Sequence, residues 1–221
     1  MRTSSTIGGT TIPAPGTYSA PLDSVAVLAA IPKANYCFVN WTGPVTIPTS
    51  ASTTVIVDQA RNVTANFAQV VTSTVAKAVV NSANHNLVNV GLAASGNCGA
   101  AATFQVRVFG DEDDQTATDN KGTVFSPDAT NIAVGTLLLR AERVDSADGR
   151  VYLIVVRAAD ALGNAGFSCS TVVVPHDTSA VSLASVNSQA AAAQAYCQAH
   201  NGAPPPSYFV IGDGPVIGPK Q

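Results

Sequence analysis

Hydrophobic and polar residues alternate along much of the chain with a period of two residues, which predicts β-strands. The alternation is clearest in Ser52–Asp58 and Asn62–Val70, and a partial form of it runs through Asp23–Ile31 before Pro32. No apolar stripe of helical spacing occurs in this part of the chain. We therefore expect residues 1–70 to form a small all-β unit.

A second series of apolar runs lies between residues 71 and 178, where turns separate them at intervals of about 8 to 15 residues. This spacing is typical of an immunoglobulin-like β-sandwich. A polar, acidic loop separates the third run from the fourth. The expected strands are residues 75–81, 86–95, 103–110, 135–143, 151–160 and 166–174.

The remaining segment, residues 179–221, has a different pattern. An Ala-rich stretch predicts one short helix, capped by Asn187 or Ser188 and ended by Gly202. Residues 204–206 are all proline and predict a stiff spacer. Residues 207–221 then predict a terminal strand, which can pair with an open sheet edge in its own chain or in a neighbour. The expected fold class is all-β with a short C-terminal helix and tail.

Composition narrows the class of protein. Charged residues make up 11% of the 221-residue chain, against roughly 25% in ordinary soluble domains. Such a surface suits secreted domains, fibres and arrays. The net charge of -3 does not indicate a basic surface for binding nucleic acid. No apolar run reaches the roughly 18 residues that span a bilayer. We expect an exported protein, extracellular or on the cell surface, whose signal peptide is not in this sequence, because the N-terminus has no apolar core.

The chain has four widely spaced cysteines: Cys37, Cys98, Cys169 and Cys197. Their spacing excludes a C-x-x-C metal or redox site. It indicates one or two disulfides in an oxidising compartment, and the alternative is buried free thiols.

The stretch "YCFVNWTG" carries Phe38, the only tryptophan, Trp41, and Gly43. Together with the preceding "GGT" and "GTY" and the following "NVTANF", it resembles a divergent internalin-type bacterial B-repeat over residues 6–68. The resemblance implies a small β-grasp-like, non-enzymatic module of surface proteins, packed around Phe38 and Trp41. The sequence departs from the family at Cys37.

A competing interpretation is that aromatic side chains of the same segment bind glycans. It requires Tyr36 and Trp41 to be exposed in a flat row with Tyr18. The chain would then be a glycan- or polymer-binding accessory module of a larger secreted enzyme.

The stretches "NCG", "LRAERVDSADGRVYLIVVRAADALGNAG" and "CSTVVVPHD" resemble an immunoglobulin-like module similar to hyalin-repeat and cadherin-like domains. The resemblance implies a Cys98–Cys169 disulfide, which closes a loop of about 70 residues and contributes roughly 4 kcal/mol. Cys37 and Cys197 remain. They either form a disulfide, within the chain or between subunits, or stay unpaired.

Acidic residues form one candidate calcium site. Calcium prefers six to eight oxygen ligands, and the candidate ligands are Asp111, Asp113, Asp114, Glu142 and Asp160. The last two resemble the scattered ligands of cadherin-like sites. The alternative is a solvated loop with ordinary turn residues, and the acidic loop is too hydrophilic for a carboxyl of raised pKa.

No catalytic motif is found. The sequence lacks a G-x-S-x-G nucleophile elbow and a glycine-rich phosphate loop between a strand and a helix, and we interpret His85 and His176 as turn residues. We expect no enzyme activity and no cofactor other than calcium. The expected function is a stalk, spacer, adhesive or fibre-forming segment of an exported bacterial protein. Its expected partners are other subunits, neighbouring domains or surface glycans, without nucleic acid or membrane insertion.

Overall fold

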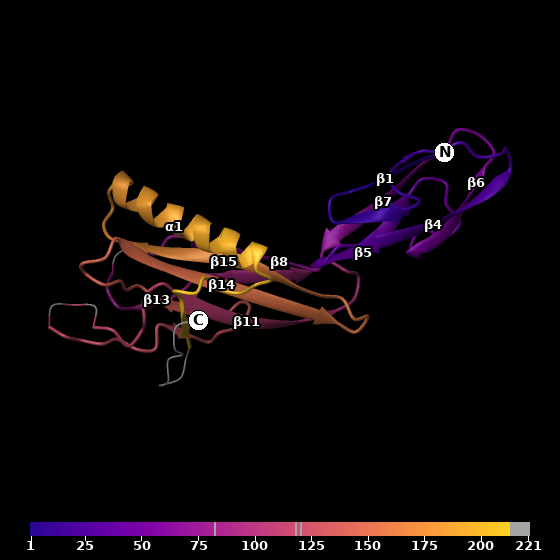
Figure 1. The fold of residues 1–221 in the computed structure, drawn as a ribbon. Coiled ribbons are helices and arrows are strands. Elements are labelled where there is room, and N and C mark those ends of the chain that lie inside the picture. Colours follow the sequence, from indigo (N-terminus) through magenta and orange to yellow (C-terminus); the bar gives the residue numbers. More distant parts are fainter. Residues whose placement is uncertain (82, 118, 120, 213–221) are drawn as a thin grey trace. The chain divides into compact units, whose positions relative to one another are not determined.

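The computed structural model describes residues 1–81, 83–117, 119 and 121–212 (Figure 1). It is all-β with a single described helix, as predicted. The chain divides into two compact units. The first comprises Met1–Val71, Gly96–Thr103 and Ala158–Gly166, and the second comprises Thr72–Ser95, Phe104–Arg157 and Phe167–Gln221.

The first unit contains two sheets. One has the strand order β3-β1-β7-β5 and the other the order β2-β4-β6. The strands are β1 (Arg2–Ser5), β2 (Gly9–Ile12), β3 (Gly16–Thr17), β4 (Ser24–Pro32), β5 (Tyr36–Thr42), β6 (Ser52–Val57) and β7 (Asn62–Gln69).

The core of this unit lies between its two sheets. Strand alternation turns every second residue of β4, β6 and β7 inward, and the cluster is centred on Leu28, Val55 and Trp41, with Phe38 and Phe67 packed against it. The strands β1 and β7 pair in parallel. The closing strand of the unit therefore lies beside its opening strand.

Backbone geometry explains the glycine of the stretch "WTG", Gly43. Its φ is +120°, and a Cβ at this position would lie 2.4 Å from the Asn62 carbonyl oxygen at the start of β7. Only glycine fits such a backbone conformation and such a close approach. The tryptophan two positions earlier thereby enters the core while the chain turns closely past β7.

The second unit is built around a sheet of order β15-β14-β11-β16, with smaller sheets β12-β13-β9 and β10-β8. Its strands are β8 (Val71–Val75), β9 (Leu87–Asn89), β10 (Leu92–Gly96), β11 (Ala102–Gly110), β12 (Ala129–Thr130), β13 (Leu138–Arg140), β14 (Gly149–Asp160), β15 (Ala165–Pro175) and β16 (Phe209–Ile211). Strands β8, β10, β11, β14 and β15 each contain residues of both units.

Helix α1 (Ala180–Ala199) lies along β15 and β14 (Figure 1). Alternate residues of β14, Val151, Leu153 and Val155, pack against its buried face, which includes Val186. The intervening residues of β14 point to the opposite face of the sheet and are also buried. Strand β14 is therefore buried on both faces over most of its length. No described helix has the length and apolarity needed to cross a membrane.

The structure corrects three details of the expected elements. Helix α1 begins at Ala180, because the Ser179 side chain accepts a hydrogen bond from the Ser182 amide and caps the helix there. Residues 75–81 are not a strand: β8 ends at Val75, and Val79 forms only an isolated bridge with Val173. The predicted strand in 207–221 is the short β16, and residues 213–221 lie outside the described part.

Candidate functional site

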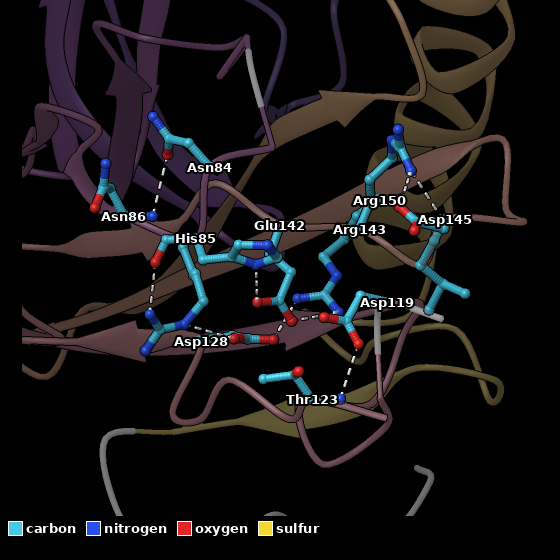
Figure 2. A network of polar contacts seen from close by, with 12 residues as sticks. Asn84, His85, Asn86, Asp119, Thr123, Asp128, Glu142, Arg143, Asp145 and Arg150 are labelled. Carbon is cyan, nitrogen blue, oxygen red and sulfur yellow. Dashed lines mark hydrogen bonds and ion pairs between the residues drawn. The ribbon is translucent and has the colours of Figure 1, made fainter. Parts of the chain in front are cut away.

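A cluster of buried charged side chains occupies the second unit, and Arg150 is its centre (Figure 2). Arg150 is the first residue after Gly149 in β14, and its side chain is fully buried. Its Nε donates to Glu112 Oε2 at 2.8 Å, and its Nη1 donates to Asp128 and to the Tyr152 hydroxyl. Its Nη2 lies 3.8 Å from Glu142 Oε1. Carboxylates from three separate loop segments thus meet one strand residue.

Asp128 is the second centre of the cluster and is also fully buried. Its other oxygen accepts from Arg140 Nε at 3.1 Å. Arg140 also donates to the carbonyl oxygens of His85 and Pro127, each at 2.7 Å. One carboxylate therefore joins two arginines, and both guanidinium groups tie loops to the strands β13 and β14.

Glu142 closes the cluster on the side of His85. The Glu142 carboxylate lies 3.0 Å from His85 Nδ1, and the imidazole stacks on Phe125 with ring centroids 3.8 Å apart. His85 has a positive φ of 62°. It is a turn residue, as the sequence indicated, but its side chain is part of the charge cluster.

Burial raises the pKa of three carboxyls here. It raises the pKa of Asp128 to about 7 despite Arg150, with Glu142 adding to the increase. Burial also raises the pKa of Asp114 to about 6 and of Asp111 to about 7. The expectation that the acidic loop is too hydrophilic for such groups was wrong, because its ends fold inward against β14.

The cluster has more carboxyls than cations, and some of its polar atoms lack a partner. In the described part of the chain, Asp114 Oδ1, Glu142 Oε1, Glu112 Oε1 and Arg150 Nη2 are buried without a hydrogen bond. Buried ion pairs are costly to desolvate and more costly to break. The arrangement can therefore fix loops on the sheet in a protonation-dependent way.

The predicted calcium ligands do not come together. Asp160 ends β14, at the opposite end of this strand from Arg150, and caps its own turn through the amides of Leu162 and Asn164. Asp113 Oδ1 accepts from the Gln115 amide in a local turn. Asp111, Asp114 and Glu142 do lie near the positive charge of Arg150, and of these three Glu142 is the one within ion-pair distance of it. Among the described residues, no group of three or more His, Cys, Asp or Glu side chains could hold a metal ion.

All four cysteines form disulfides, but the expected pairing was wrong. Cys37 pairs with Cys98, and Cys169 pairs with Cys197. The predicted pair of Cys98 and Cys169 is excluded because Cys98 belongs to the segment Gly96–Thr103 of the first unit, where it meets β5. Asn97 in this segment donates to the carbonyl oxygens of Val70 and Gln69.

The second disulfide fastens helix α1 to the sheet. Cys169 lies in β15, and Cys197 lies in the last turns of the helix. Both side chains belong to the apolar core between the helix and the sheet. Gln194 adds a hydrogen bond from its side-chain amide to the Cys169 carbonyl oxygen.

The proposed aromatic binding row is not formed. Trp41 is only 3% exposed, and its Nε1 donates to the Ser50 carbonyl oxygen at 2.9 Å. Tyr36 is half-buried, and its ring packs against Gly8. The glycan-binding interpretation built on these two residues was wrong, because Trp41 is a core residue, as the B-repeat resemblance implied.

Sequence reasoning missed Arg150 and Asp128, and it treated Glu112 only as part of the polar, acidic loop. Arg150 follows an Asp-Gly pair and reads as a turn residue, although the following apolar run of six residues, "VYLIVV", is long enough to be buried on both faces. The signal that could have identified Arg150 was a charged residue at the start of a strand that is long and apolar enough to be buried on both faces. Its partners could not be inferred, since they lie 22 and 38 residues away along the chain.

Comparisons with known proteins agree with the first part of the sequence interpretation. No curated protein matches the chain. The resemblance of the following segment to immunoglobulin-like modules has no family match and stays a prediction. Residues 2–71 match the family model of the divergent InlB B-repeat domain, a family that indicates a bacterial surface or structural module.

Proposed function

We propose that this chain is a non-enzymatic structural module, a stalk, spacer, adhesive or fibre-forming segment, of an exported bacterial protein. The observation that carries the proposal is the pair of disulfides, Cys37–Cys98 and Cys169–Cys197. Disulfides form and persist in oxidising compartments. The match of residues 2–71 to a B-repeat family supports the same assignment.

The disulfides also support a mechanical role. Each one prevents extension of the residues between its cysteines, which are separated by 61 and 28 positions. At ~3.5 Å per extended residue, the disulfides keep ~210 Å and ~100 Å of chain from contributing to the stretched length of the protein. A module under tension benefits from such limits, because the polypeptide stays short after its strands separate.

The buried charge cluster supports structure rather than catalysis. Arg150, Asp128 and Glu142 are fully buried and pair with one another, so they do not face a substrate. An enzyme needs an accessible acid, base or nucleophile. In this module the charges connect loops to β14.

A fibre-forming role has one specific structural element. Strand β16 pairs antiparallel with β11 of the same chain, with Val108 opposite Ile211, and it is the last strand of its sheet. Exchange of this short strand between copies would link subunits by edge pairing. Electron microscopy of concentrated protein tests this role. We expect polymers that are lost when residues 207–221 are deleted, and identical particles from both chains would exclude it.

Pulling on single molecules tests the mechanical role. The chain is placed between well-characterised marker domains and stretched with and without a reductant. We expect the contour length released on unfolding to increase by roughly 310 Å after reduction, from the two protected loops at ~3.5 Å per residue. An unchanged released length would show that the disulfides do not limit extension.

The compartment is tested separately in the native host. Intact cells are treated with a membrane-impermeant thiol reagent before and after reduction, and the protein is then isolated. We expect labelling only after reduction, together with digestion by external protease. Free thiols in protein that is protected from external protease would contradict export.

A further inference from the structure

A pocket of about 360 Å³ opens beside helix α1 in the second unit. Helix residues Ala192 and Tyr196 form one wall, and Pro205 and Tyr208 from the segment after the helix form another. Asp111, at the end of β11, is also part of the lining. The volume is at the lower end of the range for small-ligand sites, roughly 300–1,000 Å³.

The aromatic walls of the pocket are held in place. The Tyr196 ring stacks on His200, with centroids 3.8 Å apart and planes inclined by 11°. Tyr208 is 6% exposed and belongs to the apolar core beneath the helix. Its amide donates to the Pro205 carbonyl oxygen at 3.0 Å. A ligand would therefore meet a preformed site, which lowers the entropic cost of binding.

Asp111 is the charged group of this pocket, and it has no cation bound to it. Its carboxyl accepts a hydrogen bond from the Val151 amide at 2.9 Å and, within the described ranges, forms no ion pair. The nearby Arg150 guanidinium is committed to Glu112 and Asp128. A half-buried carboxylate with this environment is incompletely compensated.

The titration of the site agrees with this geometry. Burial raises the pKa of Asp111 to about 7, and the charge of Glu112 adds to the increase, while the Val151 amide and Arg150 act in the other direction. Burial also raises the pKa of Tyr208, with a further contribution from the negative charge of Asp111. Asp111 and Tyr208 thus influence each other across the pocket.

We propose that this pocket binds a primary alkylammonium group, with the ammonium on Asp111 and the alkyl chain between the tyrosine rings. The attraction between an ammonium group and the carboxylate offsets the free-energy cost of desolvating the carboxylate. An ammonium group is also attracted to aromatic faces. Alanine, proline and tyrosine walls accommodate the alkyl chain. An anionic ligand is repelled by Asp111, and a neutral one leaves its charge uncompensated. The inference does not depend on the structural role proposed above.

Calorimetric titration of the full chain with n-pentylamine tests the site, with n-pentanol as the uncharged probe of matched length. We expect saturable binding of the amine at millimolar concentrations and at least tenfold weaker binding of the alcohol, since a hydrogen-bonded charge is worth ~1.5–3 kcal/mol, or ~10-fold and more. Equal binding of both probes, or no binding of the amine, overturns the proposal.

Variants identify the carboxyl. Asp111→Asn keeps an acceptor for the Val151 amide but removes the charge, and we expect it to weaken amine binding by about tenfold or more. Asp113→Asn, a change of the same kind outside the pocket, is the matched control and keeps wild-type affinity. Ala192→Leu narrows the pocket without touching the acid, suits a helix, and is expected to abolish binding. Wild-type affinity in Asp111→Asn or Ala192→Leu overturns the assignment.

The pH dependence and the source of the ammonium follow from the same titration. Pentylamine stays charged below pH ~10, so we expect its affinity to fall between about pH 8 and about pH 5.5 as Asp111 takes up a proton. An affinity independent of pH contradicts the role of Asp111.

A second probe, Nα-acetyl-lysine amide, distinguishes two sources of the ammonium group. It represents a lysine side chain of a partner protein, whereas pentylamine represents a free small amine. Stronger binding of the lysine derivative favours the protein source, and stronger binding of pentylamine favours the free amine.

Discussion

Arg150 and Asp128 form an ion pair in which both side chains are completely buried. The pair joins the start of β14 to a loop residue 22 positions earlier in the chain. Arg150 also binds Glu112, and Asp128 also binds Arg140. The loops of the second unit are therefore held on the sheet by charges that water does not reach.

Replacing Arg150 by methionine should destabilise the chain strongly. The change keeps a long side chain but leaves Glu112 without its cation and Asp128 with Arg140 alone. Removing one partner of a buried ion pair costs ~3–5 kcal/mol. Urea unfolding measures the loss. Arg107→Met is the control, because Arg107 is exposed, and exposed substitutions usually change stability by ~0.5 kcal/mol or less. Adding Asp128→Asn to the Arg150 variant should recover part of the lost stability. An Arg150→Met variant as stable as the wild type would contradict the role of the cluster.

Stability should decrease as the pH rises from about 4 to about 7. The pKa values of Asp111 and Asp128 are raised to about 7 and that of Asp114 to about 6, from an ordinary value of 3.8. The folded chain therefore holds protons that the unfolded chain releases, and the stabilisation is present at the acidic end of this range and lost at the neutral end. Thermal unfolding at several pH values measures the effect, since ~1 kcal/mol shifts the Tm by ~2–4 °C in a chain of this size.

Asp114→Asn is the sharpest variant for this pH dependence. Asparagine still accepts the hydrogen bond from the Asp128 amide, which Asp114 Oδ2 accepts at 3.3 Å, but it does not titrate. We expect a smaller decrease of Tm with pH than in the wild type. Asp145→Asn, at a half-exposed position, should leave the slope unchanged, and equal slopes in all three proteins would refute the assignment.

Removing each disulfide should destabilise the chain, and the loss of stability should differ between the two. In the chain-entropy account, loops of 61 and 28 residues correspond to ~4.3 and ~3.6 kcal/mol. The paired alanine variants of Cys37 with Cys98, and of Cys169 with Cys197, are compared by urea unfolding. Peptide mapping without reduction gives the connectivity directly, and a cross-linked peptide containing Cys98 and Cys169 would contradict the structure.

The fluorescence of Trp41 reports on the core of the first unit. Because the indole is buried between the two sheets, we expect weak quenching by acrylamide and no change on titration with polysaccharides. Trp41→Ala should cost ~3–5 kcal/mol, as for other large core side chains. Val39→Ala on the same strand is the control, since Val39 is 44% exposed. Strong quenching in the folded protein would refute the burial of Trp41.

Local patterns predicted the fold class and the first unit well. The alternation in β6 and β7 is regular, and the packing centre at Phe38 and Trp41 follows from the B-repeat resemblance. The start of α1 was misplaced by several residues, because Ser179 was not recognised as its cap and residues 180–187 lack a clear apolar stripe. Capping by one side chain outweighed the weak pattern of the first turns.

Relations between distant residues could not be predicted in the same way. Four cysteines allow three complete pairings, and the choice depends on where Gly96–Thr103 meets β5. The charge cluster likewise depends on loops that approach β14 from several parts of the chain. The sequence displays the acidic residues of these loops, but only the fold shows that Arg150 lies at their centre.

The Cys37–Cys98 disulfide has a consequence for how this module can be inherited. The family match ends at residue 71, whereas the partner of Cys37 lies 61 positions further along than Cys37 itself. A gene segment that encodes only the matched repeat would transfer Cys37 without Cys98 and produce a protein with an orphan thiol. In this chain the repeat therefore depends on a cysteine outside the residues that match the family. Shuffling of such modules between genes should preserve it only together with the segment that supplies its second cysteine.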